Sequence, residues 1–291
     1  MRVHLVDGTY ELFRHFFAVP KMKDNAGNEC GALVGVIQSL IGMLEADATH
    51  LGVATDHVIE SFRNDMYAGY KTGAGIDPLL WEQFEPLEAA IAALGVVIWP
   101  MVDVEADDAL AAAATVAAAD SRVKQVLLCS PDKDLAQCVT GSRIVMLDRR
   151  SGAILNARGI EEKFGVPPAS IPDYLALVGD SADGYPGLPG WGAKSASTVL
   201  ARYKHLEKIP KDVASWNVTL RGAEKLSAVL REKWDDALLF RKLATLRTDK
   251  PKVNVDKLAY KGPKREFEAM AENWRRPKLF ARATAVAERA G

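Results

Sequence analysis

Short apolar runs alternate with segments of helical spacing through the first half of the chain. The apolar runs predict buried strands, which lie at 3–6, 51–55, 96–99, 125–129 and 143–147. Between them, apolar residues recur every three or four positions, which predicts helices at 31–46, 83–94 and 106–119. Strands that alternate with helices in this way predict an α/β fold, with a mostly parallel central sheet flanked by helices.

The alternation ends near residue 156, and the second half of the chain predicts short helices. The stretch 143–155 reads as a hairpin at the edge of the sheet. A Gly- and Pro-rich stretch then precedes a helix that is expected to start near Ala193. The segment 64–82 contains three glycines and has weak periodicity, which favours a mobile excursion from the sheet.

Composition narrows the class of protein. With 48% hydrophobic and 26% charged residues in 291, the chain has the balance of an ordinary globular protein. No apolar run approaches the roughly 18 to 20 residues of a membrane span, and the first residues lack a signal-peptide pattern. The three cysteines form no C-x-x-C pair, which predicts a reducing, intracellular setting without disulfides or a cysteine zinc site.

The net charge of −1 conceals an uneven distribution along the chain. Residues 1–189 hold 14 Lys and Arg against 26 Asp and Glu, whereas residues 190–291 hold 23 against 12. The basic end could bind a polyanion and the acidic end could bind cations. A solvated basic helical region would give the same counts, so charge alone leaves both interpretations open.

Carboxylates follow four of the predicted strands. In an open parallel sheet the carboxyl ends of the strands meet at one crevice, where ligands bind. Each acid alone could be a turn residue or a helix cap, but together they would repel one another and raise each other's pKa. Lys133 is the one basic residue beside them, and hard cations such as Mg²⁺ and Mn²⁺ prefer oxygen ligands, so a metal site is predicted. The acids are Asp7, Asp56, Glu105, Asp107, Asp108, Asp132 and Asp134.

Several motifs, in sequence and in order, resemble those of the 5′-nuclease family, which comprises flap endonucleases and the 5′→3′ exonuclease domain of bacterial DNA polymerase I. They are "LVDGTYELFR", "ATDHVIESFR", "YAGYK", "VEADD", "SPDKDLAQ" and "LVGDSADGYPGLPGWGAKSA". The resemblance covers nearly the whole chain. It implies a structure-specific DNA 5′-nuclease, either an exonuclease or a flap endonuclease, that hydrolyses phosphodiesters near junctions of single strand and duplex. Because no polymerase-like sequence follows, a free-standing member is expected.

The resemblance also implies a domain organisation. Residues 1–178 would form a PIN-like, metal-dependent nuclease core that includes a helical arch around 64–90. Residues 179–291 would form a helical, helix-three-turn-helix DNA-binding region that completes the second metal site. By the same resemblance, the protein would act as a monomer on 5′-flap, nicked or branched duplex DNA, independently of sequence, in the bacterial cytoplasm.

Two Mg²⁺ or Mn²⁺ ions are implied by the resemblance, each with its own carboxylates. The first site would consist of Asp7, Asp56, Glu105 and Asp107, supported by Asp108. The second would consist of Asp132, Asp134, Asp180 and Asp183. Backbone carbonyls in the Gly-rich hairpin would hold a K⁺ ion.

The family motifs imply roles for further residues. Lys71 would neutralise charge on the phosphate, Arg14 would contact a phosphate, and Tyr70 would stack on an unpaired base. The chain departs from the family at Ala74, where an arginine is usual, and Lys71 is the only Lys or Arg from 64 to 100. Candidate contacts to the duplex backbone are Gly190, Gly192, Lys194, Ser195, Arg202, Lys204, Arg221 and Lys225.

Two other functions share parts of this pattern. A PIN-type ribonuclease has the acid-tipped sheet, but the basic Gly- and Pro-rich hairpin after Asp183 argues against it. A catalytically silent protein that binds branched DNA would keep the hairpin, but it would not need the full set of acids.

Overall fold

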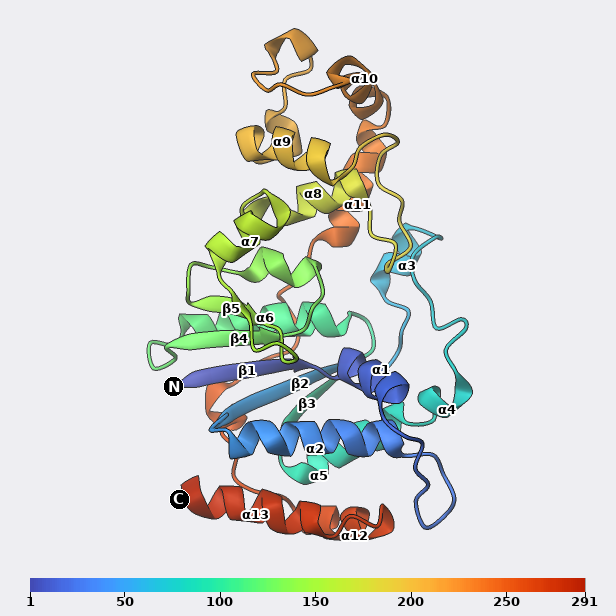
Figure 1. Ribbon diagram of the computed structural model, residues 1–291, viewed down its shortest axis with the longest axis vertical. Coiled ribbons are helices and arrows are strands. Elements are labelled where there is room, and N and C mark those ends of the chain that lie inside the picture. Colours follow the sequence, from blue (N-terminus) through green and yellow to red (C-terminus); the bar gives the residue numbers. More distant parts are fainter. Residues whose placement is uncertain (291) are drawn as a thin grey trace. The chain divides into compact units, whose positions relative to one another are not determined.

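The computed structural model describes residues 1–290 (Figure 1). The chain separates into two compact units, each made of segments that are distant in sequence. Unit 1 comprises Met1–Ile59, Gly73–Ser130 and Arg247–Gly291, and unit 2 comprises Glu60–Thr72 and Pro131–Leu246. These limits differ from a single boundary at 178/179, because the chain leaves unit 1 twice and returns to it each time.

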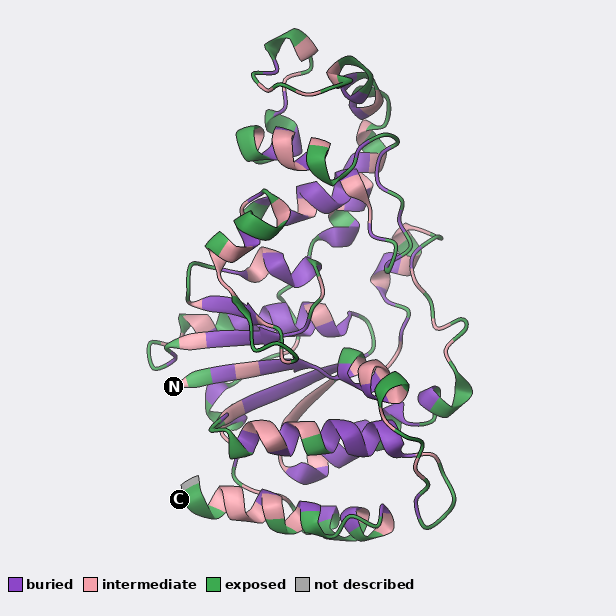
Figure 2. Ribbon diagram, in the orientation of Figure 1, coloured by how far each residue is buried: buried purple, intermediate pink, exposed green. Residues whose placement is uncertain are grey.

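Unit 1 is built on four parallel strands in the order β3-β2-β1-β4. Their bounds, which confirm four of the predicted strands, are β1 Arg2–Asp7, β2 His50–Asp56, β3 Val97–Met101 and β4 Gln125–Cys129. Parallel strands are covered on both faces and therefore consist of continuous apolar runs. Accordingly, Val3, Leu5 and Val6 of β1 are fully buried, and Figure 2 shows β2 mostly in the buried colour.

Helices cover both faces of this sheet (Figure 1). The steps from β1 to β2 and from β2 to β3 run in one direction, so right-handed crossovers place their helices on the same face. The return from β3 to β4 runs in the opposite direction and places α6 on the other face. The helices of the first face are α1 Gly8–Ala18, α2 Gly31–Glu45 and α5 Phe84–Leu94, and α6 is Ala106–Ala119. α2, α5 and α6 confirm predictions, whereas α1 was not predicted.

The C-terminal segment of the chain belongs to unit 1. Its elements are η5 Val255–Leu258, α12 Glu266–Asn273 and α13 Lys278–Ala290. α13 packs on α2 and α12 packs on α5, which gives a further helical layer outside the first (Figure 1). The Tyr260 hydroxyl donates to the Ala283 carbonyl at 3.2 Å, and Arg282 pairs with Glu45 at 2.7 Å. The expectation that residues 179–291 form one region is therefore not met by residues 247–290.

Unit 2 is mainly helical. Its helices are α3 Phe62–Met66, α7 Ala157–Phe164, α8 Ile171–Val178, α9 Ala193–Tyr203, α10 Ala223–Glu232 and α11 Trp234–Ala244. Its short 3₁₀ turns are η1 Asp134–Cys138, η2 Pro168–Ser170, η3 Leu206–Lys208 and η4 Val213–Ser215. β5 Ile144–Leu147 and β6 Ile154–Leu155 pair as the predicted hairpin.

A buried carboxylate fixes the helices of unit 2. The Asp173 side chain on α8 accepts a hydrogen bond from the Leu206 N–H at 3.2 Å and pairs with Arg241 of α11 at 3.1 Å. The His205 Nδ1 atom lies 2.9 Å from the second carboxylate oxygen of Asp173. Because α8, α11 and the η3 turn all meet at Asp173, the side chain ties three separate segments together.

The excursion between β2 and α5 is only partly helical. It contains α3 and the short helix α4, Pro78–Trp81, whereas residues 67–77 form turns and bends. Gly69, Gly73 and Gly75 lie in the irregular part, and glycine is a poor helix former. The expected helical arch around 64–90 is thus interrupted.

Among residues 1–290, no helix combines the length and the apolar character that a bilayer crossing requires.

The end of α5 supplies a test of the packing in unit 1. Gly95 and Gly75 both have φ +87°, but a Cβ atom on Gly95 would lie 2.1 Å from the Gly262 carbonyl oxygen, whereas one on Gly75 would meet nothing within 4 Å. Gly75→Ala should therefore cost only the left-handed strain, about 1–2 kcal/mol. Gly95→Ala should cost about 1–3 kcal/mol more, because the backbones must separate. Urea unfolding measures both, and equal losses would contradict this packing.

Candidate active site

Four carboxylates of unit 2 lie on two short segments. Asp132 and Asp134 come directly after β4 in the sequence, and Asp180 and Asp183 lie on the loop that follows α8. The backbones of Asp180 and Tyr185 exchange two hydrogen bonds, of 3.0 and 3.1 Å, which closes this loop tightly. Gly184 has φ +85° and a Cβ atom there would lie 2.3 Å from the Gly69 carbonyl oxygen, so the position requires glycine.

The structure brings these four acids close enough to act on one another. Asp134 is only 4% exposed. Burial raises its pKa well above the usual range, and the charges of Asp132, Asp183 and Asp180 raise it further, while Arg63 lowers it. Within residues 1–290, the Asp134 Oδ1 atom is buried and has no hydrogen-bond partner. The four acids therefore form a cluster whose negative charge is incompletely compensated.

Two lysines pair with this cluster. The Lys133 ammonium lies 2.6 Å from Asp180, and the Lys71 ammonium lies 2.9 Å from Asp183. The Lys71 N–H also donates to the Asp183 carbonyl at 2.9 Å. The cluster thus has a basic neighbour besides Lys133, because the chain folds Lys71 back onto Asp183 from a distant segment.

The donor set fits a hard divalent cation, although it is not a preassembled site. Among the described residues, no three Asp, Glu, His or Cys side chains converge on one point as a ready metal group. All donors of the cluster are oxygens, and the Asp134 Oδ1 atom lacks a partner. A divalent cation would bind here by displacing the lysine ammonium groups from Asp180 and Asp183, and would relieve the repulsion among the acids.

Arg63 is a buried cation beside this cluster that sequence reasoning missed. Its side chain is 1% exposed, and it donates to the carbonyls of Leu243 at 2.7 Å and Thr245 at 3.3 Å. An arginine in a short helix is usually a surface residue, so nothing in the local sequence predicts its burial. Tyr185, buried next to the same acids, was also missed.

The candidate acids of unit 1 lie at strand and helix ends, where backbone groups hold them. Asp7 caps α1 by accepting from the Tyr10 N–H at 2.8 Å, and it also accepts from the Ser130 hydroxyl at 3.0 Å. Asp56, at the end of β2, accepts from the Ala106 N–H at 2.7 Å. These contacts orient each carboxylate from a fixed backbone.

Glu105, Asp107 and Asp108 open α6, and they are not equivalent. Asp108 is fully buried, and its two oxygens accept from the N–H groups of Glu105 at 3.0 Å and Arg247 at 2.8 Å. Asp108 therefore supports the start of α6 and joins it to the C-terminal segment. This arrangement agrees with a supporting position and leaves Glu105 and Asp107 as the candidate ligands there.

Arg14 and Tyr70 lie in settings that the motifs did not indicate. The Arg14 guanidinium on α1 lies 2.5 Å from Glu11, which is itself buried. Tyr70 is 3% exposed, with the Lys71 ammonium 5.7 Å from the centre of its ring. Because the ring of Tyr70 is buried, the expectation that it stacks on an unpaired base is not met in this conformation.

A groove gathers most of the predicted duplex contacts. It has a volume of about 740 Å³ and lies at the start of α9 and α10. Gly190, which lines it, has φ +80°, and the Gly192 N–H donates to the Ser195 hydroxyl at 2.9 Å. The predicted residues in its lining are Gly190, Gly192, Lys194, Ser195, Arg221 and Lys225. Arg202 and Lys204 do not line it, because they lie at the opposite end of α9.

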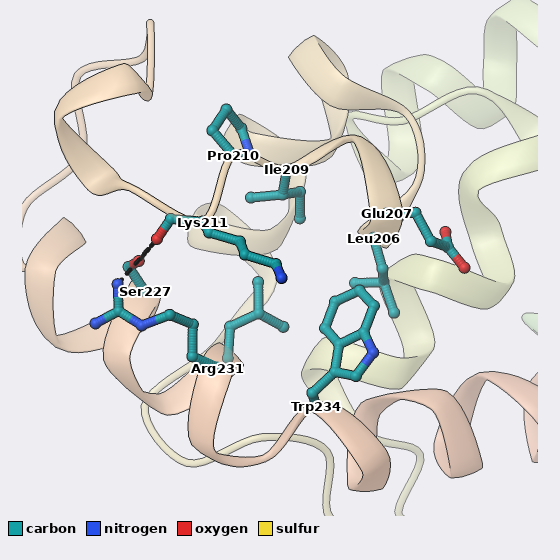
Figure 3. Close-up of a pocket in the computed structure, with 9 residues that line it drawn as sticks. Leu206, Glu207, Ile209, Pro210, Lys211, Ser227, Arg231 and Trp234 are labelled. Carbon is teal, nitrogen blue, oxygen red and sulfur yellow. Dashed lines mark hydrogen bonds between the residues drawn. The ribbon is translucent and has the colours of Figure 1, made fainter.

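A second hollow of unit 2, of about 450 Å³, is mostly apolar (Figure 3). Leu206, Ile209, Pro210 and Leu230 line it together with Trp234. The neighbouring segment is fixed where the Lys211 carbonyl accepts from the Arg231 guanidinium at 2.9 Å and from the Ser227 hydroxyl at 3.4 Å, as Figure 3 shows. None of the predicted site residues lines this hollow, so it is not the candidate active site.

Comparison with known proteins gives matches along nearly the whole chain. Residues 2–165 match the 5′-3′ exonuclease N-terminal resolvase-like domain, and residues 166–266 match the 5′-3′ exonuclease C-terminal SAM fold. DNA polymerase I of Pseudomonas aeruginosa is 37% identical over 273 residues, which cover 90% of this chain but only 29% of that polymerase. The 5′-3′ exonuclease of Buchnera aphidicola subsp. Baizongia pistaciae is 34% identical, with 87% of this chain and 82% of the relative covered.

A solved structure with the same fold is that of the bacteriophage T5 flap endonuclease, in a pseudo-enzyme-product complex with DNA and metal ions. Its TM-score is 0.64 at 21% identity, and the alignment covers 99% of this chain and 100% of the T5 chain. At this identity the likeness is one of fold.

The burial of Arg63 can be tested by its removal. Arg63→Met should lower the free energy of unfolding by on the order of 3 kcal/mol, because the buried Leu243 carbonyl and the Thr245 carbonyl lose a charged donor and the nearby acids lose a cation. Arg158→Met, which removes an exposed arginine from the same unit, should change stability little. Urea unfolding measures both variants in metal-free buffer. If the two lose the same free energy, Arg63 does not hold the cluster together.

Proposed function

The chain belongs to the 5′-3′ exonuclease family, and from this membership and the geometry of the site we propose that it is a divalent-metal-dependent, structure-specific DNA 5′-nuclease. The observation that carries the proposal is the buried carboxylate cluster of unit 2, whose all-oxygen donors fit a hard cation. The substrate would be a 5′ flap, nick or branched duplex, cut in the manner of a flap endonuclease or a 5′→3′ exonuclease.

Residues of both units would hold the two cations. Asp132, Asp134, Asp180 and Asp183 would be the ligands of one ion, and Asp7, Asp56, Glu105 and Asp107 would be those of the other. When bound, a pair of divalent ions activates a water and stabilises the attacking and leaving oxygens of a phosphodiester. The hydrogen bonds that Asp7 and Asp56 accept from the backbone orient them before any ion arrives.

Lys71 is the residue best suited to the phosphate. Its ammonium pairs with Asp183, so it is at the cluster already and 27% of its side chain is exposed. In the reaction it would turn to the scissile phosphate and neutralise the charge that develops there. Arg14 of unit 1 would contact a phosphate of the DNA, with the buried Glu11 holding the guanidinium in place.

The groove at the start of α9 and α10 would bind the duplex. Helix N-termini present unpaired N–H groups to phosphates, and Lys194, Arg221 and Lys225 add positive charge. Contacts of this kind fix the register of a duplex without reading its sequence. The fold neighbour from phage T5 is itself a complex with DNA and metal ions, which supports a DNA substrate over RNA.

The proposal has finer parts. The divalent ion would be Mg²⁺ or Mn²⁺, and a K⁺ ion would sit on backbone carbonyls of the Gly190–Gly192 turn. The protein would act as a monomer in a bacterial cytoplasm.

Removal of one cluster acid tests the chemistry. Asp132→Ala should reduce cleavage of a labelled 5′-flap DNA by a factor of roughly 10³ or more, because a ligand of one of the two cations is lost. Binding of the same DNA in Ca²⁺ should persist. Asp148→Ala, at the exposed hairpin turn, is the matched control and should cleave normally. The same assay with an RNA flap tests the ribonuclease alternative, which predicts cleavage of the RNA flap. If the parent protein binds flap DNA but never cleaves it with Mg²⁺ or Mn²⁺, it is a silent binder.

Salt dependence tests the groove. Duplex affinity should fall steeply as salt rises, with a slope of about 0.9 per phosphate contact. Lys194→Ala and Lys225→Ala should each reduce this slope by about 1, equally for unrelated sequences. Lys204→Ala removes the same charge outside the groove and should have a smaller effect. Fluorescence anisotropy at several salt concentrations gives the slopes. If Lys194→Ala and Lys204→Ala reduce the slope equally, the groove is not the duplex-binding site.

A further inference from the structure

Tyr185 carries a buried hydroxyl group that the structure leaves unsatisfied. The side chain is 1% exposed, and within the described part of the chain its oxygen finds no hydrogen-bond partner. The ring is well packed, since it stacks on Phe240 with 5.6 Å between the centroids, and Phe240 meets Tyr67 edge-on at 5.7 Å. A phenylalanine would keep this packing, so the ring does not explain the hydroxyl.

A buried hydroxyl group without a hydrogen-bond partner lowers the stability of the fold. Leaving a buried donor without a partner costs about 1–3 kcal/mol. Buried polar groups in native proteins nearly always have partners, and each exception needs an explanation, such as a functional role or a bound water or ion. The buried Tyr185 hydroxyl therefore calls for such an explanation.

The surroundings of the hydroxyl identify that partner. Burial raises the pKa of Tyr185, and the charges of Asp134, Asp183, Asp180 and Asp132 raise it further, with Asp134 the strongest. The phenol thus lies amid the carboxylate cluster. Asp134 is also the cluster acid whose Oδ1 atom is buried without a partner. Unit 2 thus holds an unsatisfied donor and an unsatisfied acceptor, both buried and both subject to the charges of the same carboxylates.

The backbone ties Tyr185 to the metal ligands. Tyr185 and Asp180 exchange two backbone hydrogen bonds across the loop that also carries Asp183. A cation bound to Asp180 and Asp183 in place of their lysine partners would act on this loop, and through it on the position of the Tyr185 side chain.

We propose that Tyr185 is a positioning residue of the unit 2 metal site, whose hydroxyl donates a hydrogen bond to the Asp134 carboxylate, directly or through one water, once the cation is bound. The bond fixes the orientation in which Asp134 ligates the ion. Partners of this kind, one step removed from the metal, typically change its affinity about 10- to 100-fold. The inference rests on the proposed function, because it assumes that the cluster binds a divalent cation.

The test compares Tyr185→Phe with Tyr174→Phe, which removes a hydroxyl from another mostly buried tyrosine in the same unit. Mn²⁺ affinity is measured without DNA, by electron paramagnetic resonance of the free ion, and thermal stability is measured in EDTA. Tyr185→Phe should weaken Mn²⁺ binding about 10-fold. The same variant should be as stable as the parent in EDTA, or more stable, because it loses an unsatisfied group. Tyr174→Phe should leave the Mn²⁺ affinity unchanged.

A double-mutant cycle with Asp134→Asn supplies the second measurement. If the two groups interact, the losses of Mn²⁺ affinity will not add. Unchanged Mn²⁺ binding by Tyr185→Phe would overturn the proposal, as would strictly additive losses or a variant that is less stable in EDTA with parental affinity. The Mn²⁺ result is independent of cleavage: a parent protein that fails to cut DNA would refute the nuclease, while a Tyr185 effect on Mn²⁺ binding would still stand.

Discussion

Repulsion between buried carboxylates is the constraint around which unit 2 is organised. Asp132, Asp180 and Asp183 are held where each disfavours the ionisation of Asp134. Nearby basic side chains reduce this repulsion. Arg63 lies beside the cluster, and Lys71 and Lys133 pair with two of its members. A fold tolerates such a loss of stability when the same charge is needed for binding a cation. Here three separate segments of the chain, 60–72, 131–138 and 180–183, supply the acids and their basic partners.

Hydrogen bonds to the end of α11 hold two of these segments together. The Gln137 side chain donates to the Ala244 carbonyl at 2.8 Å and accepts from the Leu246 N–H at 3.1 Å, which joins the segment after β4 to the end of α11. Arg63 contacts the same stretch from α3. The end of α11 is therefore a common anchor for both the acid-bearing turn and the Lys71 segment, and the geometry of the cluster depends on it.

Much of the fold and of the acid set could be predicted from sequence, because both follow from local patterns. Apolar runs and helical spacing located the four parallel strands and the helices α2, α5 and α6, and the motifs located the acids. Apart from the missed helix α1 and the interrupted arch, the failures concern long-range contacts. Burial of Tyr70 and Arg63, the return of Lys71 to Asp183 and the role of Asp108 in holding Arg247 depend on residues distant in the chain. The assignment of residues 247–290 to unit 1 likewise could not be predicted from their own sequence, because it depends on packing against α2.

The position of α13 has a consequence for how the protein is made. α2 is among the first helices to leave the ribosome, yet the helix that covers it ends at residue 290, and the Arg282–Glu45 pair spans 237 positions. Unit 1 therefore stays open on one side while the greater part of the chain is translated, a period in which exposed apolar surface favours aggregation and chaperone binding. Unit 2 is encoded in the middle of the chain and depends on no later residue than Leu246, so it can form first. The order of folding would thus invert the order of the sequence, with the half that opens the chain completed last.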